Sequence, residues 1–296
     1  MLRHWCKSLF ADELWIVIQP HEILLQRVSR RLSARSKPQV FSTKRIECAH
    51  KLLEKNTDET DWAILARYLR QELNEPMCQS ALPRRVLSNH FVRYAVIPWN
   101  NELSTQDERL AYTKHSFAQA FGERVKDWDL RISQSSYGQS AIASAVDFRL
   151  LTKIHAIFDE LNMPLQAVLP QLMLIINHVF DEIEKKDLIQ KVQQTDAFWI
   201  VMIQHQRLCL ALYDQSGWRL VKNMVAEQDV MRQVKTIMHR EIVNGNLKKE
   251  LPVLVYWPEF NHNINALAAP FIQISPCYID VQNTLKSKFK QDLAFA

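Results

Sequence analysis

Short apolar runs alternate with polar breaks and amphipathic stretches along the whole chain. At the start, apolar residues at 14–18 and 23–28 flank a polar break, Gln19-Pro20-His21-Glu22. Two such runs around a Pro-containing turn predict a β-hairpin. The next expected elements are a third strand at 40–46 and an amphipathic helix that begins near Asp58 and ends at Pro76.

The middle of the chain continues this alternation of strands and helices. The expected elements are a strand pair at 84–87 and 91–97, a helix between Ser104 and Gly122, strands at 128–133 and 140–146, and a helix from Asp147 to Leu161. Ser104 followed by Asp107 is typical of a helix N-cap, and Gly122 is typical of a helix end. This order of elements predicts an α/β protein.

A repeated hairpin pattern divides the chain into two halves. Leu14-Trp15-Ile16-Val17-Ile18 recurs as Phe198-Trp199-Ile200-Val201-Met202, and a polar turn that contains His21 or His205 follows each copy. The remaining elements are expected as strands at 208–213, 218–221, 253–257 and 271–274 and a helix at 230–242. Similar hairpins at the head of each half predict two related α/β lobes.

The composition fits a globular protein of one large or two medium domains. Of 296 residues, 47% are hydrophobic and 23% are charged, as is ordinary for a chain with a buried core. No apolar run approaches the roughly 20 residues that cross a bilayer, and the start lacks the apolar core of a secretory signal. Five scattered cysteines favour free thiols in a reducing compartment. A cytoplasmic protein is therefore expected.

Positive charge is concentrated at the start of the chain. The net charge is +5, and residues 1–50 contain nine Lys or Arg against four Asp or Glu. This excess is found on surfaces that contact phosphate, acidic lipid or an acidic partner. More often, such a stretch is a solvated strand edge that its cations keep soluble.

Four segments of the chain carry a resemblance to a known family. They are the amphipathic leader at 1–10, the segment Arg84-Arg85-Val86-Leu87-Ser88-Asn89-His90-Phe91-Val92-Arg93-Tyr94-Ala95-Val96-Ile97-Pro98-Trp99, the polar helix and Trp-containing strand after it, and the stretch from Ala145-Val146-Asp147 to Ala167-Val168-Leu169-Pro170. In this order they resemble the PilM family, actin-like proteins of type IV pilus assembly with relatives in mannose-sensitive haemagglutinin pili and type II secretion. The resemblance spans residues 1 to about 280 and lies in the order of elements.

The resemblance implies a particular division of the chain. The fold class is α/β, a two-lobed actin-like (ribonuclease-H-like) fold with an inserted α+β subdomain. The implied parts are an amphipathic leader at 1–12, a first lobe at 13–147 with an inserted subdomain at about 84–133, a second lobe at 148–283 and a tail at 284–296. In the family, adenine nucleotide lies between the lobes, and glycine-bearing turns of both hairpins hold its phosphates.

The loops that would hold nucleotide lack the residues that this chemistry requires. Glycine lets the backbone approach a phosphate and adopt a positive φ. The chain has only four glycines, and the turns at 19–22 and 203–206 contain none. Trp257-Pro258-Glu259 stands where the family has a glycine-rich loop, and no Asp ends the first strand. The resemblance therefore implies a pseudo-ATPase without a cofactor rather than an enzyme.

Other catalytic patterns are also missing from the sequence. It contains no GxxxxGK[ST], GxGxxG, GxSxG or HExxH. Asp127 and Asp129 could face one side of an expected strand as an acid pair, but a solvated face is the commoner reason for this spacing. Two alternatives stay open. One is a regulated ATP-binding actin-like ATPase with altered loops, and the other is a nucleic-acid-associated ribonuclease-H-like protein that uses the basic residues 1–50.

The resemblance favours a function in partner binding. It implies a non-catalytic cytoplasmic scaffold of a pilus or type II secretion-like assembly platform, which binds the cytoplasmic tail of a single-pass inner-membrane protein. The candidate partner-binding residues are Asn89, Phe91, Arg93, Tyr94 and Trp99, because an exposed hairpin there would present residue types enriched in interfaces. The alternative is that these aromatic side chains belong to the core. A second copy of the chain is a further candidate partner, no nucleic acid is expected, and contact with the inner face of the inner membrane is expected to be indirect.

Overall fold

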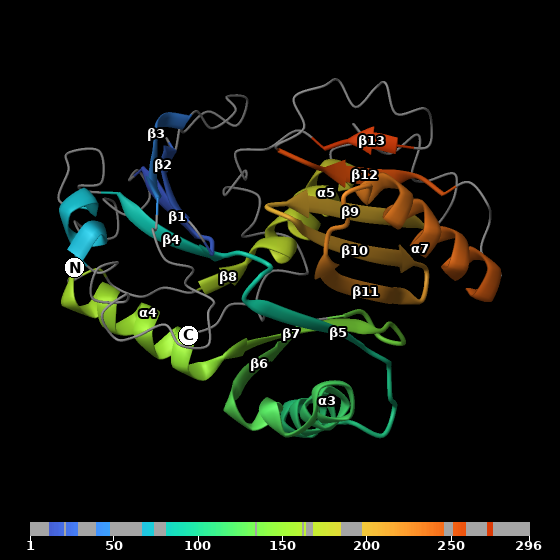
Figure 1. Ribbon diagram of the computed structural model, residues 1–296. Coiled ribbons are helices and arrows are strands. Elements are labelled where there is room, and N and C mark those ends of the chain that lie inside the picture. Colours follow the sequence, from blue (N-terminus) through green and yellow to red (C-terminus); the bar gives the residue numbers. More distant parts are fainter. Residues whose placement is uncertain are drawn as a thin grey trace.

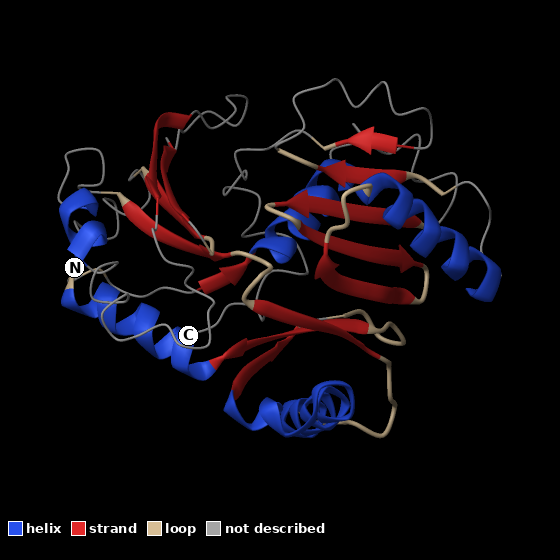
Figure 2. Cartoon of the chain, viewed as in Figure 1, coloured by secondary structure: helices blue, strands red, loops and turns tan. Residues whose placement is uncertain are grey.

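The computed structural model describes residues 12–20, 22–28, 40–47, 67–73, 81–133, 135–161, 163, 168–184, 197–245, 251–258 and 271–274. Nearly all of the predicted leader, all of the predicted tail and most of the predicted helix between Asp58 and Pro76 lie outside these residues; residues 67–73 of that helix are helical. Within the described part, the strands form two five-stranded sheets and one three-stranded sheet (Figure 1, Figure 2).

The first sheet combines an antiparallel meander with parallel strands. Its strands are β1 (Glu13–Ile18), β2 (Glu22–Val28), β3 (Val40–Glu47), β4 (Leu82–Leu87) and β8 (Val168–Pro170). Their order is β3-β2-β1-β4-β8. The predicted hairpin is the antiparallel pair β1–β2, whereas β4 is parallel to both β1 and β8. Covered on both faces, the central strand β1 is an almost continuous apolar run.

The second sheet repeats this arrangement. Its strands are β9 (Phe198–Gln204), β10 (Arg207–Asp214), β11 (Gly217–Val225), β12 (Val253–Tyr256) and β13 (Phe271–Gln273). Their order is β11-β10-β9-β12-β13, with an antiparallel meander followed by parallel strands, as in the first sheet. The shared topology confirms the two related lobes predicted from the repeated hairpin.

A three-stranded antiparallel sheet is inserted between β4 and β8. Its strands are β5 (Val92–Ile97), β6 (Trp128–Ile132) and β7 (Ala141–Asp147), in the order β5-β7-β6. Between β5 and β6 run α3 (Gln106–Phe121) and the 3-10 helix η1 (Gly122–Asp127), and Phe117 of α3 packs into the sheet. Figure 1 shows α3 lying against this small sheet, away from the two large ones. The inserted sheet spans 92–147 rather than the predicted 84–133.

The predicted strand pair at 84–97 is wrong. β4 and β5 follow each other in the sequence but lie in different sheets. β4 pairs with β1 along one edge and with β8 along the other, so it offers no free edge to β5. Because β8 belongs to the first sheet, the first lobe also extends to Pro170, beyond the predicted boundary at residue 147.

Local capping explains where the helices begin and end. α4 (Phe148–Glu160) follows Asp147, whose carboxylate accepts from the N–H of Arg149 at 2.9 Å, as predicted. For α3, the cap is Thr105 rather than Ser104, in a capping box with Glu108. Gly122, with a φ of 72°, ends α3 as predicted. The remaining named helices are α5 (Gln171–Glu184) and α7 (Val230–Gly245).

One large core joins the two lobes. It contains buried residues of β1, β9, β10, α4 and α5, and α5 contributes Leu172, Ile175 and Val179. A second cluster fills the space between the second sheet and α7, where Val234 and Ile237 pack against the strands. Because the lobes share a core, their first hairpins are held in a fixed relative position.

Candidate functional site

The first hairpins of the two lobes meet at their turns. In the second lobe, His205 and Gln206 have φ values of 45° and 60°, a left-handed backbone that is uncommon for residues other than Gly, Asn and Asp. The imidazole Nε2 of His205 lies 3.5 Å from Oε1 of Glu22, the first residue of β2. A carboxylate–imidazole contact therefore joins the first hairpins of the two lobes at their turns.

Side chains from the first lobe hold the second turn in place. His90 Nε2 lies 3.0 Å from the carbonyl oxygen of His205, and its Nδ1 lies 2.8 Å from the hydroxyl of Ser88. A carbonyl only accepts, so Nε2 carries the proton and Nδ1 accepts from Ser88. Beside this link, the amide of Gln171 donates to that of Gln204, and both side chains are buried.

Asn89 is the centre of the polar network at the lobe junction. Its Oδ1 accepts from the Tyr94 hydroxyl at 2.7 Å and from the N–H of Leu172, in the first turn of α5, at 3.1 Å. Its Nδ2 contacts Met202 Sδ at 3.1 Å, and its carbonyl accepts from Asn223 at 2.7 Å. The side chain and the backbone carbonyl of Asn89 thus connect the first lobe, β5, α5 and the second lobe.

Cys209, Ser88 and Asp129 are the candidate chemical groups whose surroundings the structure describes. No three His, Cys, Asp or Glu side chains among them come together as a metal site. Burial raises the pKa of Cys209 to about 12, so this thiol is protonated at neutral pH and is a poor nucleophile. Ser88 bonds to His90 but is buried, and Asp129 forms an ion pair with Arg131 at 3.1 Å.

The five predicted partner-binding residues lie in two places. Asn89, Phe91 and Tyr94 are buried at the lobe junction, and Arg93 is half-buried beside them. Trp99 follows the other end of β5 and is partly exposed. The exposed hairpin on which their selection rested does not form, because β5 packs beside β11 of the second lobe.

Arg93 faces a second arginine across the junction. Its Nη1 donates to the carbonyl oxygens of His90 and Val92 at 3.2 and 3.1 Å, and burial lowers its pKa. Arg207 donates from Nε to Asn223 Oδ1 at 2.6 Å, and its pKa is lowered by burial and then by the charge of Arg93. Hydrogen bonds to neutral oxygens therefore hold two cations that repel each other.

A pocket of about 430 Å³ opens where β5 ends. It is formed by the end of β5, the start of α3 and the segments that leave β6 and enter β7. Trp99 lies in its wall, with the Tyr137 ring edge-on at 4.9 Å and the Arg109 guanidinium 5.3 Å from the indole centre. The sequence did not single out Arg109 or Tyr137. Tyr137 lies outside the predicted inserted segment and far from Trp99 in the chain, so no local pattern indicated that these rings meet.

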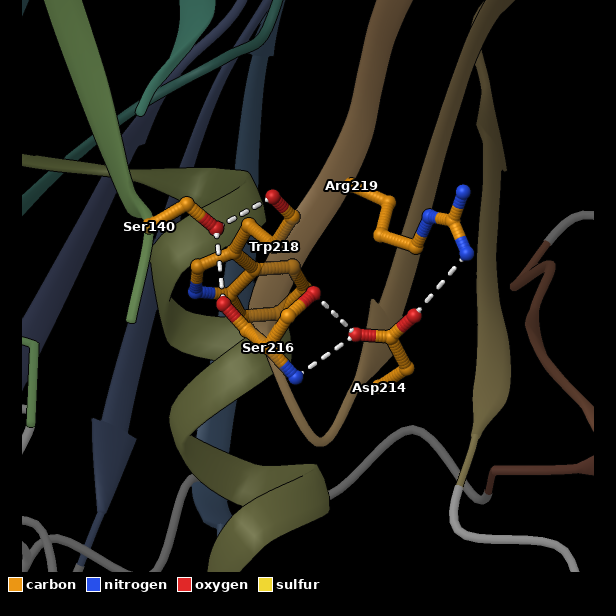
Figure 3. Close-up of polar contacts among 5 residues, drawn as sticks. All are labelled: Ser140, Asp214, Ser216, Trp218 and Arg219. Atoms are coloured by element: carbon orange, nitrogen blue, oxygen red, sulfur yellow. Dashed lines mark hydrogen bonds and ion pairs between the residues drawn. The ribbon is translucent and has the colours of Figure 1, made fainter. Parts of the chain in front are cut away.

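The inserted subdomain is fastened to the second lobe beside this pocket. Figure 3 shows Ser140, whose hydroxyl lies 2.5 Å from the carbonyl oxygen of Trp218 and 3.3 Å from that of Ser216. Asp214 accepts from the N–H and hydroxyl of Ser216 and from Arg219, which fixes the β10–β11 turn (Figure 3). Gly217 allows the approach, because a Cβ there would lie 2.7 Å from the carbonyl oxygen of Ser140.

Two lobes with one strand order and an inserted sheet define an actin-like ATPase fold. Solved structures of this fold match most of the chain. A Bacteroides thetaiotaomicron protein with an actin-like ATPase fold and unknown function is 10% identical over 95% of this chain and 97% of that one, with a TM-score of 0.57. The cytoplasmic domain of EpsL, an inner membrane component of the type II secretion system of Vibrio cholerae, is 9% identical over 95% and 97%, with a TM-score of 0.54.

A third similar structure is the PilM–PilN type IV pilus biogenesis complex. It is 11% identical over 90% of this chain and 89% of that chain, with a TM-score of 0.61. The PilM-like, actin-like fold predicted from the sequence is therefore confirmed. No model of a protein family and no curated protein matches the sequence. Among the described residues, no helix is long and apolar enough to cross a membrane.

Proposed function

We propose that this chain is a non-catalytic scaffold of a pilus or type II secretion-like assembly platform. It would lie in the cytoplasm at the inner face of the inner membrane and bind the cytoplasmic tail of a single-pass membrane protein. Two similar structures support this assignment. One is the cytoplasmic domain of an inner-membrane component of a secretion system, and the other is a two-protein complex of type IV pilus biogenesis.

The contact between the two hairpin turns carries the non-catalytic part of the proposal. A phosphate between the turns would need backbone N–H groups and close approach. Here it would meet the carboxylate of Glu22 and the side chain of His205, which lie 3.5 Å apart. A carboxylate repels the oxygens of a triphosphate, and the contacts of His90 and Gln171 hold the second turn where it is.

Titration with Mg-ATP tests the loss of nucleotide binding. We expect the purified full chain to give no binding heat in calorimetry and no rise in unfolding temperature at millimolar nucleotide. Because a ligand of the native state stabilises it by mass action, the two readouts check each other. A dissociation constant in the micromolar range would contradict the proposal and favour a regulated ATPase.

Cross-linking in the cell that produces the protein tests the partner. The tagged full chain should be joined to a protein with one membrane span, and a synthetic peptide of its cytoplasmic tail should bind the purified chain. The Trp99→Ala variant should bind that peptide more weakly, because Trp99 lines the pocket of the inserted subdomain. Tyr68→Ala removes a 43% exposed aromatic side chain from the first lobe and serves as the control. If no single-span protein binds, the scaffold assignment is wrong.

A further inference from the structure

The pocket beside Trp99 forms one end of the inserted subdomain. The core between α3 and the small sheet, which includes Ile97 and Phe117, ends there. Ile97 and Ile132 line the pocket from the sheet, and Leu103 lines it from the segment before α3. Its floor is therefore apolar enough to accept a hydrophobic side chain.

The charge on the pocket lining is positive. Arg109 is its charged residue, and no Asp or Glu belongs to the lining. The Nε of Arg109 donates to the carbonyl oxygen of Leu103 at 3.4 Å, and the guanidinium lies against the indole of Trp99. The neighbouring acid Glu108 is bound in the capping box with Ser104 and Thr105. Within the described part of the chain, Arg109 forms no ion pair with a carboxylate, so its outer nitrogens can bind one from a ligand.

The part of the pocket wall that leads into β7 is held in place before a ligand binds. Gln139, a lining residue, donates to the carbonyl oxygen of Gln215 in the second lobe at 3.0 Å. Ser140, next in the chain, is fastened to the same turn through Ser216 and Trp218, as Figure 3 shows. A wall fixed in this way loses little conformational freedom when a ligand binds.

The surroundings of the pocket favour a peptide over a small anion. Tyr137 packs edge-on against Trp99, and yet the residue is 85% exposed. A small anion on Arg109 would leave this ring uncovered, whereas a chain that continues past the pocket would cover it. Trp, Tyr and Arg are also the residue types that dominate binding energy at protein interfaces.

We propose that this pocket binds a partner peptide in which an Asp or Glu side chain pairs with Arg109 and an adjacent apolar side chain enters between Ile97, Leu103 and Ile132. The proposal rests on the proposed function only in that the ligand is a protein segment. It adds the chemistry of that segment, acidic beside apolar, and its place on the inserted subdomain.

A phage-displayed library of random heptapeptides, selected on the immobilised full chain, tests the proposal. Counter-selection uses the Gln106→Trp variant, which narrows the pocket by enlarging an exposed lining residue. We expect the selected peptides to share an Asp or Glu next to Leu, Ile or Phe. A resynthesised peptide should lose about tenfold or more in affinity when its Glu is changed to Gln, because a charge-assisted bond is lost.

Two arginine variants give the matched comparison. Arg109→Gln should lower the affinity for the selected peptide by a similar factor. Arg124→Gln removes an exposed charge of η1 in the same subdomain and should leave this affinity unchanged. Circular dichroism confirms that both variants fold. The proposal would be overturned if no peptide were selected or if the selected peptides lacked an acid. It would also be overturned if a selected peptide bound Arg109→Gln as tightly as wild type, or if an equal concentration of acetate displaced it. A membrane-protein tail that binds wild type and Arg109→Gln equally would overturn the pocket assignment alone and leave the proposed function standing.

Discussion

The carboxylate of Glu22 lies 3.5 Å from the imidazole of His205, so the first hairpins of the two lobes touch at their turns. Both side chains are partly exposed, and even an ion pair between exposed groups contributes only about 0–1 kcal/mol. The stability of the junction must therefore come from the buried groups behind it. Of these, Asn89 connects β5, α5 and the strands of the second lobe.

Replacement of Asn89 by alanine should destabilise the protein by about 2–4 kcal/mol. The variant leaves the Tyr94 hydroxyl and the N–H of Leu172 buried without their acceptor, and each unsatisfied group costs roughly 1–3 kcal/mol. Urea unfolding measures the change. Asn244→Ala, at an exposed position of α7, is the control and should stay within about 0.5 kcal/mol. An equal effect of both substitutions would show that the network is not what holds the lobes.

Stability should fall as the pH rises above about 9. Burial raises the pKa of Tyr94 above 10.0 and that of Cys209 from 9.0 to about 12. The unfolded chain releases these protons at lower pH than the folded chain does, so between the two pKa values the unfolded state binds fewer protons and gains in stability. Urea midpoints from pH 8 to pH 11 give the slope. Tyr94→Phe and Cys209→Ala should each flatten it, and an unchanged slope in both would contradict this origin.

Gly217→Ala should cost more stability than Gly138→Ala. Both glycines have a positive φ, 96° and 80°, so an L side chain costs about 1–2 kcal/mol at either position. At Gly217 the new Cβ would also collide with the backbone of Ser140, at 2.7 Å, whereas a Cβ at Gly138 would meet no atom within 4 Å beyond its chain neighbours. The difference between the two unfolding free energies isolates the contact between the inserted subdomain and the second lobe. Equal losses of stability would mean that the backbone of Ser140 moves away from residue 217 at little cost in free energy.

Features that depend on residues close together in the sequence could be predicted from it. The hairpins at Trp15 and Trp199 could be predicted because each is an apolar run, a polar turn and a second apolar run, and their likeness predicted the two lobes. Asp147 and Gly122 marked helix ends for similarly local reasons.

Features that depend on distant residues could not be predicted in this way. The turn at Ser88 looked like a hairpin turn, but the pairing of β4 with β1 and β8 sends β5 into another sheet. Asn89 looked like a surface residue because two of its partners, Met202 and Asn223, lie more than 100 positions away in the sequence. Tyr94 is buried with it, since its hydroxyl donates to Asn89. The pocket at Trp99 likewise depends on Gln139, which the second lobe positions.

Gln206→Gly should stabilise the protein by up to about 1 kcal/mol and still not create ATP binding. Gln206 has a φ of 60°, so glycine relieves a left-handed backbone at the cost of a more flexible unfolded chain. Gln215→Gly is the matched control, since Gln215 is an exposed turn residue without a positive φ and its replacement should destabilise by about 0.5–1 kcal/mol.

Calorimetry with Mg-ATP on the Gln206→Gly variant tests nucleotide binding. Glu22 and the His90 contact with His205 remain, so a glycine alone does not open a phosphate site. Micromolar ATP binding by this variant would show that the missing glycine, rather than the joined turns, abolished nucleotide binding.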